Sequence, residues 1–256
     1  MTLPADADLN KSLQSVPVPV VDLPLGDIAT IRAEVTNDKV GVSVELGIPG
    51  ETVGPLLTRK LQDAVREETG IGDAEIDIAT KIVAHGVQRN LKPLPGVRNI
   101  IAIASGKGGV GKSTTAVNLA LALAAEGASV GILDADIYGP SIPLMLGVAD
   151  QRPSSDDGQS LNPLQAHGLQ VMSIGFLIEA DQPMVWRGPM VTQALNQMLQ
   201  QTRWDDLDYL VVDMPPGTGD IQLTLSQQVP VSGAVIVTTP QDIALLDARK
   251  GLQMFR

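Results

Sequence analysis

A glycine-rich loop between two apolar segments constrains the fold of this chain more than any other feature of its sequence. The loop, Gly106–Thr114, reads GKGGVGKST; it follows the apolar run at 100–104 and precedes a helix-like segment at 115–122. Glycines without side chains let successive backbone N–H groups curl around a polyphosphate at a helix N-terminus, where the helix dipole favours negative charge. Strand, loop and helix in this order predict a phosphate-binding loop.

The residues of this loop have distinct expected roles. Lys112 is expected to meet the outer phosphates of a nucleotide, and the Ser113 hydroxyl to face Mg²⁺. Lys107 is unusual, because a generic phosphate loop leaves that position free; it is either functional or a solvated surface lysine. The predicted nucleotide-binding residues are Gly106, Lys107, Gly108, Gly109, Val110, Gly111, Lys112, Ser113 and Thr114.

Two carboxylates follow the apolar run at 131–133, where a sheet would present them beside the phosphates. In phosphoryl transfer, catalysis is mostly positioning and charge neutralisation, so a carboxylate here can position the attacking water or hold a Mg²⁺-bound water. Asp136 is the candidate for this role. The alternative is that Asp134 or Asp136 only caps a turn or a helix start.

A second acidic loop follows the apolar run at 209–212. Asp213 comes just past the last apolar residue and is predicted to hold Mg²⁺ through water, in a glycine-containing loop that extends to Asp220. We therefore predict Lys107, Lys112, Asp136 and Asp213 as catalytic residues. Ser113 and Asp213 are the predicted Mg²⁺ ligands.

Apolar runs alternate with helix-like segments through the C-terminal part of the chain. The expected strands are 100–104, 129–133, 209–212 and 233–238. The expected helices lie near 113–126, 191–202 and 242–255. Continuous apolar runs are typical of parallel strands covered on both faces, and right-handed crossovers then predict a doubly wound, mostly parallel α/β sheet.

The N-terminal part predicts a separate small α+β domain. Residues 28–35 and 39–46 alternate as hairpin strands, 54–69 has helical periodicity, and 75–82 alternates again. The segment 89–97 has the composition of a linker. We predict domains at 1–88 and 98–256.

Composition excludes several classes of function. The 256 residues carry 18 Lys and Arg against 29 Asp and Glu, a formal charge of −11, which disfavours nucleic-acid and anionic-membrane partners. With no cysteine, these residues form no disulfide, thiolate nucleophile or cysteine-bound metal site. The N-terminus lacks a signal-peptide pattern and no apolar run reaches membrane-spanning length, so we expect a cytoplasmic protein.

Five sequence blocks stand out together: GKGGVGKST, DADIYGPS at 134–141, VWRGPM at 185–190, DMPPGTGDIQLTL at 213–225 and TTPQDIAL at 238–245. They resemble the Mrp/ApbC family of ATP-binding iron–sulfur cluster carriers almost continuously over 96–256. Lys107 resembles the extra lysine of the deviant Walker A loop of the wider MinD/ParA class, which reaches the partner subunit's nucleotide. The N-terminal domain is similar, more weakly, to the small assembly domain of many bacterial members.

The resemblance implies ATP binding and slow hydrolysis by a homodimer that holds a 4Fe–4S cluster and passes it to apo iron–sulfur proteins. In the family the cluster ligands are a CxxC pair beyond the strand that would follow Phe255. This chain ends before that strand, so it is either C-terminally truncated or a variant without cluster ligation. We expect truncation, because missing strands would leave an open sheet edge, and no iron–sulfur ligand lies in these residues.

Two other functions remain open for such a loop. One is a MinD/ParA-like positioning ATPase, which would need a basic amphipathic tail or a DNA-binding patch. The other is a small-molecule ATP-dependent ligase of the same fold, whose turnover a metabolite would stimulate.

Overall fold

The chain folds into two compact units. The computed structural model describes residues 6–36, 39–87, 91–177 and 188–255. The smaller unit comprises Met1–Val83 with Ala125–Gly127, and the larger one comprises Ala84–Ala124 with Ala128–Arg256. Each unit has its own hydrophobic core. The predicted division at residues 88 and 98 stays a prediction.

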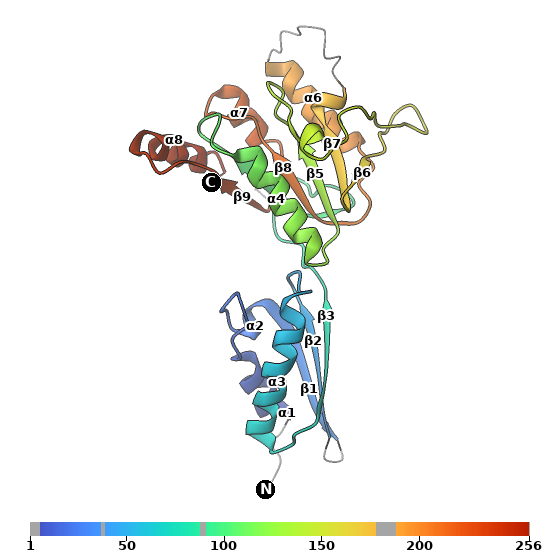
Figure 1. Ribbon diagram of the computed structural model, residues 1–256, viewed down its shortest axis with the longest axis vertical. Coiled ribbons are helices and arrows are strands. Elements are labelled where there is room, and N and C mark those ends of the chain that lie inside the picture. The colour runs from blue at the N-terminus through green and yellow to red at the C-terminus, as the bar shows by residue number, and fades with distance from the viewer. Residues whose placement is uncertain (1–5, 37–38, 88–90, 178–187, 256) are drawn as a thin grey trace. The chain divides into compact units, whose positions relative to one another are not determined.

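In the smaller unit, helices cover one face of a three-stranded sheet of order β1-β2-β3 (Figure 1). Strands β1 and β2 pair antiparallel, as the alternating sequence predicts, and β3 pairs parallel to β2. Leu57, Leu61 and Val65 lie on one face of α3 and are fully buried. The elements are α1 (Asp6–Gln14), α2 (Leu25–Ile28), β1 (Ala29–Thr36), β2 (Lys39–Leu46), α3 (Val53–Thr69) and β3 (Ala74–Thr80).

The larger unit is built on a six-stranded sheet of order β6-β7-β5-β8-β4-β9. All neighbours in it are parallel except the β6–β7 pair. The strands are β4 (Val97–Ala104), β5 (Val130–Asp134), β6 (Leu164–Ala166), β7 (Leu169–Ser173), β8 (Leu207–Asp213) and β9 (Gly233–Ile236). This sheet and its helices confirm the predicted α/β class, with the four predicted strands present.

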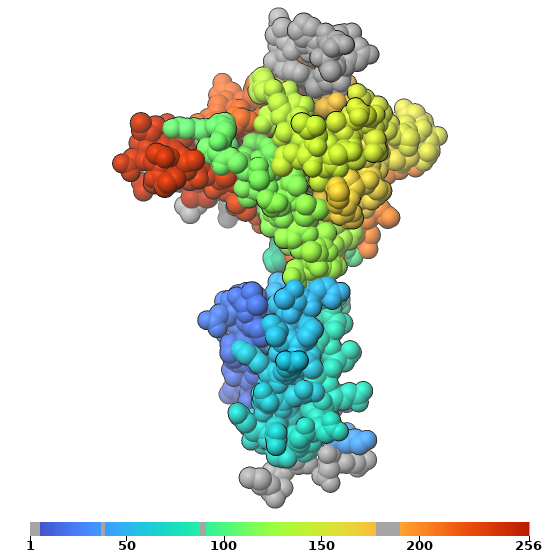
Figure 2. All heavy atoms as spheres, viewed as in Figure 1, coloured from blue at the N-terminus to red at the C-terminus, as the bar shows by residue number. Residues whose placement is uncertain are grey.

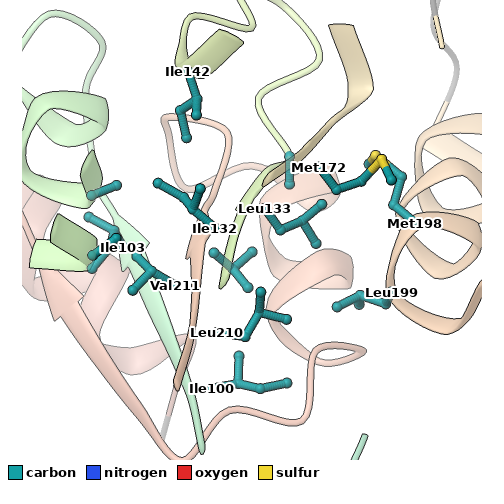
Figure 3. Packing of buried hydrophobic residues seen from close by; sticks show 14 of the residues in the cluster. Ile100, Ile103, Ile132, Leu133, Ile142, Met172, Met198, Leu199, Leu210 and Val211 are labelled. Carbon is teal, nitrogen blue, oxygen red and sulfur yellow. The ribbon is translucent and has the colours of Figure 1, made fainter. Parts of the chain in front are cut away.

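Helices complete the larger unit. They are α4 (Lys112–Ala125), α5 (Ile142–Met145), α6 (Gly188–Gln201), α7 (Asp220–Ser226) and α8 (Asp242–Gln253), with a 3₁₀ turn η1 (Ile174–Phe176). In the core, Ile132 and Leu133 of β5 pack with β8 residues, and Met172 and Met198 point toward each other (Figure 3). Within the described part of the chain, no helix combines the length and apolar character needed to cross a membrane.

The β6–β7 hairpin is the main element that the sequence analysis missed. Its strands have three and five residues and join through His167 and Gly168, which both have positive φ, 50° and 77°. A two-residue loop with positive φ at both positions matches the right-handed twist of a hairpin. Histidine replaces the more usual Asn or Asp there, so the turn was not evident from the sequence.

Candidate functional site

The glycine loop connects the carboxyl end of β4 to the start of α4. Gly109 and Gly111 have φ of 75° and 90°, a region that side chains strongly disfavour. An added Cβ at Gly108, Gly109 or Gly111 would meet nothing within 4 Å, so the loop backbone is open on that side. Helix α4 begins at Lys112, which places the loop N–H groups at a helix N-terminus as a phosphate site requires.

Lys112 is the centre of a buried charged cluster. Its Nζ lies 2.6 Å from Asp213 Oδ1 and 3.4 Å from Asp136 Oδ2, and it donates to Ser113 Oγ at 3.3 Å. Lys112, at the start of α4, is only 6% exposed, and Asp213, at the end of β8, is fully buried. The structure thus brings together four of the predicted site residues: Lys112, Ser113, Asp136 and Asp213.

The two carboxylates after β5 have different surroundings. Asp134 Oδ1 accepts from the Asp136 N–H at 3.1 Å, and Asp134 Oδ2 accepts from the Ile142 N–H at 3.1 Å and the Ser173 hydroxyl at 3.2 Å. Asp134 therefore organises the backbone, whereas Asp136 faces Lys112. Of the two alternatives left open by the sequence, the turn-holding one describes Asp134.

Burial and mutual repulsion shift the acids of this cluster. Burial, with the nearby charge of Asp213, raises the pKa of Asp134 to about 7, although its three hydrogen bonds act in the opposite direction. Burial also raises the pKa of Asp213, and the Lys112 ammonium opposes that rise. The site therefore carries a concentrated negative charge that one lysine partly compensates.

Two carboxylate oxygens of the cluster have no hydrogen-bond partner among the described residues. They are Asp136 Oδ1 and Asp213 Oδ2, and both are buried. An unpaired buried carboxylate oxygen is destabilising, and hard cations such as Mg²⁺ prefer oxygen ligands. No group of three or more acidic, His or Cys side chains suited to a metal ion occurs in the described ranges. In proteins, Mg²⁺ usually keeps several waters and binds through one or two carboxylates plus substrate phosphates.

Lys107, the second lysine of the loop, contacts helix α8. Its Nζ lies 3.8 Å from Asp247 Oδ2, and Lys250 approaches the other oxygen at 3.5 Å. A Cβ added to Gly106 would lie 2.7 Å from Asp247 Cβ, so the loop and the helix touch. In Figures 1 and 2 the green glycine loop reaches from α4 toward the dark red α8. Lys107 is partly exposed and takes no part in the Lys112 cluster.

The loop after β8 is tied to the glycine loop through the backbone. The Gly217 N–H donates to Ser105 O at 2.8 Å, and Gln222 Nε2 donates to Pro216 O at 2.7 Å. Ser105, immediately before the glycine loop, in turn donates its hydroxyl to Lys107 O at 2.8 Å. A direct hydrogen bond therefore joins the 213–220 loop to Ser105, the residue that precedes the glycine loop.

The sequence analysis missed Ser173 and Asp247 as neighbours of this site. Ser173 ends the short β7, and Asp247 lies mid-helix in α8, so neither follows a recognisable motif. Only the strand order and the packing of α8 bring these two residues to the site, because they come from distant parts of the chain. Residues 185–187 of the VWRGPM block lie outside the described residues.

Comparison with known proteins identifies relatives of the larger unit. The family model described as ParA, NUBPL iron-transfer P-loop NTPase, matches residues 96–256. A Haemophilus influenzae protein named iron-sulfur cluster carrier protein is 56% identical over 88% of this chain and 60% of its own length. A Salmonella typhimurium protein of the same name is 70% identical over 65% of this chain. This chain spans only 45% of that relative's length.

One solved structure has a similar fold. It is a nucleotide-binding protein from Archaeoglobus fulgidus in complex with ADP, with a TM-score of 0.54 and 40% sequence identity. The similarity covers 62% of this chain and 61% of that one. It confirms the P-loop α/β fold for the larger unit.

Proposed function

The chain belongs to the ParA family of NUBPL-type iron-transfer P-loop NTPases, and from that premise we propose that it binds and hydrolyses ATP to drive iron–sulfur cluster transfer to apoproteins. Relatives named iron-sulfur cluster carrier proteins support the assignment. Because the chain spans 60% and 45% of these two relatives, the activity of the whole protein is part of the proposal.

The observation that carries the proposal is the position of Lys112. Its ammonium lies between Asp213 and Asp136 at the N-terminus of α4, directly after the open glycine loop. A buried lysine that pairs with two acids directly after a glycine loop suits a nucleotide triphosphate with its Mg²⁺. A surface lysine in an ordinary turn would not be buried against two carboxylates.

In the proposed cycle, the loop N–H groups and Lys112 bind the β- and γ-phosphates of ATP. Ser113 and Asp213 would hold Mg²⁺, and the bound ion would supply charge neutralisation at the phosphates. Asp136 orients the attacking water through its unpaired Oδ1. Lys107 leaves Asp247 and joins the nucleotide of the partner subunit in a homodimer. Loss of the γ-phosphate then relaxes the 213–220 loop.

The cluster is cargo in this proposal, and its ligands come from outside these residues. Iron–sulfur clusters are held by Cys thiolates, and the 256 residues contain no cysteine. The described site therefore supplies the nucleotide-dependent step. Hydrolysis is slow, and contact with an apo iron–sulfur protein accelerates it.

Isotope-labelled ATP tests the first half of this function. The chain should bind ATP with Mg²⁺ and release phosphate. Lys112→Ala should weaken ATP binding by about ten- to 100-fold and remove phosphate release, whereas Lys92→Ala, a change at an exposed lysine outside the loop, should change neither. Calorimetry that detects no ATP uptake by the folded chain would contradict the proposal.

The second half is tested by comparing stimulants of ATP turnover. An apo-ferredoxin should raise the rate, and anionic lipid vesicles and duplex DNA should not. Stimulation by vesicles or DNA alone would favour a positioning ATPase. Stoichiometric stimulation by a small metabolite would favour a ligase.

A further inference from the structure

Asp134 is the most completely hydrogen-bonded acid of the site, and the proposed cycle does not use it. It is fully buried at the last position of β5. Three donors converge on its two oxygens: the N–H groups of Asp136 and Ile142 and the Ser173 hydroxyl. Asp136 and Asp213 differ from it, because each has a buried oxygen without a partner among the described residues. Both oxygens of Asp134 are therefore already held by donors of the protein, in a fully buried position.

The bonds of Asp134 close the loop that carries Asp136. The N–H of Asp136 lies two residues after Asp134, and the N–H of Ile142 starts α5 at the other end of the loop. One carboxylate therefore holds both ends of the segment 135–141. Since the Asp136 backbone is fixed at 3.1 Å from Asp134 Oδ1, the place of the Asp136 side chain beside Lys112 depends on Asp134.

Ser173 extends this arrangement to the neighbouring strand. Its Oγ accepts from the Gly175 N–H at 3.0 Å, so its own hydrogen is free to donate to Asp134 Oδ2 at 3.2 Å. The Pro140 ring packs on the same turn, where a Cβ added to Gly175 would lie 3.2 Å from Pro140 Cβ. The loop is thus held against β7 by a polar contact and an apolar one.

We propose that Asp134, supported by Ser173, is a positioning residue of the ATPase reaction that acts through Asp136 by fixing the loop 135–141 in its catalytic geometry. This role rests on the proposed hydrolysis of ATP. Positioning errors of about 1 Å reduce turnover by on the order of 100-fold, so loss of the arrangement is expected to lower kcat strongly.

Asp134→Asn is the sharpest test. Both oxygens of Asp134 accept a backbone N–H, so an amide NH₂ in either orientation faces an N–H group and breaks one of the two bonds. We expect kcat for ATP hydrolysis to fall by about 10- to 100-fold, with the affinity for ATP changed less than about threefold. Asp150→Asn makes the same chemical change at an exposed position and should behave as the wild-type chain.

A double-mutant cycle separates positioning from general damage. If Asp134 acts through Asp136, adding Asp134→Asn to Asp136→Asn should lower kcat by less than about twofold further. Ser173→Ala removes the hydroxyl's bonds with Asp134 and with the Gly175 N–H but keeps both backbone bonds to Asp134. It should lower kcat by about three- to tenfold and be equally silent in the Asp136→Asn background. Circular dichroism confirms folding of each variant.

Three results would overturn the inference. The first is an unchanged kcat in folded Asp134→Asn. The second is a double variant, Asp134→Asn with Asp136→Asn, whose kcat loss equals the product of the two single losses. If Asp134→Asn does not fold, the test rests on Ser173→Ala, measured in the wild-type and Asp136→Asn backgrounds. An unchanged kcat of Ser173→Ala in the wild-type background is the third result that would overturn the inference. A wild-type chain that binds ATP without hydrolysing it contradicts the proposed function instead, and is recognised before any variant is measured.

Discussion

The buried Asp134 carboxyl predicts an inverted pH dependence of stability in the larger unit. Burial raises its pKa from 3.8 to about 7, so the folded protein binds more protons than the unfolded chain between these values. The free energy of unfolding therefore falls as the pH rises through this range, by about 4 kcal/mol in total. About 3 kcal/mol of this fall lies between pH 5 and pH 8. Asp134→Asn, which has no charge to titrate, should lose this component.

Urea unfolding measures the effect directly. Both tryptophans, Trp186 and Trp204, belong to the larger unit, so their fluorescence reports on this unit alone. Unfolding free energies are compared at several pH values for wild type, Asp134→Asn and the exposed control Asp150→Asn, with EDTA and without nucleotide. The wild type should lose its advantage over Asp134→Asn as the pH rises, and the control should follow the wild type. A difference that stays constant within about 0.5 kcal/mol would refute the reasoning.

Three further changes have distinct expected results. Lys112→Ala should lower the ATP affinity about ten- to 100-fold, as measured by calorimetry. Because Asp213 loses its buried partner, the variant should also reduce the free energy of unfolding by about 3–5 kcal/mol. An unchanged midpoint of urea unfolding would contradict this expectation. Lys107→Ala should leave the ATP affinity and the free energy of unfolding nearly unchanged, because the Lys107–Asp247 contact is long and partly exposed. It should abolish ATP turnover in the proposed homodimer, and full turnover would exclude the role of Lys107 at the partner subunit's nucleotide. Gly106→Ala should destabilise the fold by about 1–3 kcal/mol, because the added methyl group clashes with Asp247. Gly108→Ala, with open space around it, should not. Equal melting temperatures of the two variants would show that α8 shifts to accommodate the methyl group.

The local features of the site were predictable because each is coded by neighbouring residues. The glycine loop needs only glycines, a lysine and a hydroxyl in one short segment, flanked by a strand and a helix. Asp136 and Asp213 follow apolar strands, and the carboxyl ends of parallel strands share one edge of the sheet. The sequence therefore predicted their meeting with Lys112 and named Asp136 as the candidate. It did not predict the hydrogen bonds that hold Asp134, since these depend on the path of the backbone between 135 and 142.

Contacts between distant segments were not predictable in the same way. Ser173 reaches Asp134 because β7 lies beside β5, and β7 was missed owing to its short length and its polar Gln170. Asp247 meets Lys107 only through the packing of α8 on the glycine loop. Such pairs depend on tertiary topology, which single-sequence periodicity does not specify.

The close ion pair between Lys112 and Asp213 makes nucleotide binding an exchange reaction. At 2.6 Å the lysine already has an anionic partner, so an incoming triphosphate competes with a resident counterion. Measured affinity then reflects a difference between two ion pairs, not the full strength of either. In the proposed cycle, the same competition would favour release, because Asp213 would pair with Lys112 again once the bound anion loses charge. In the proposed cycle, the protein itself therefore supplies the counterion that replaces the departing phosphate at Lys112.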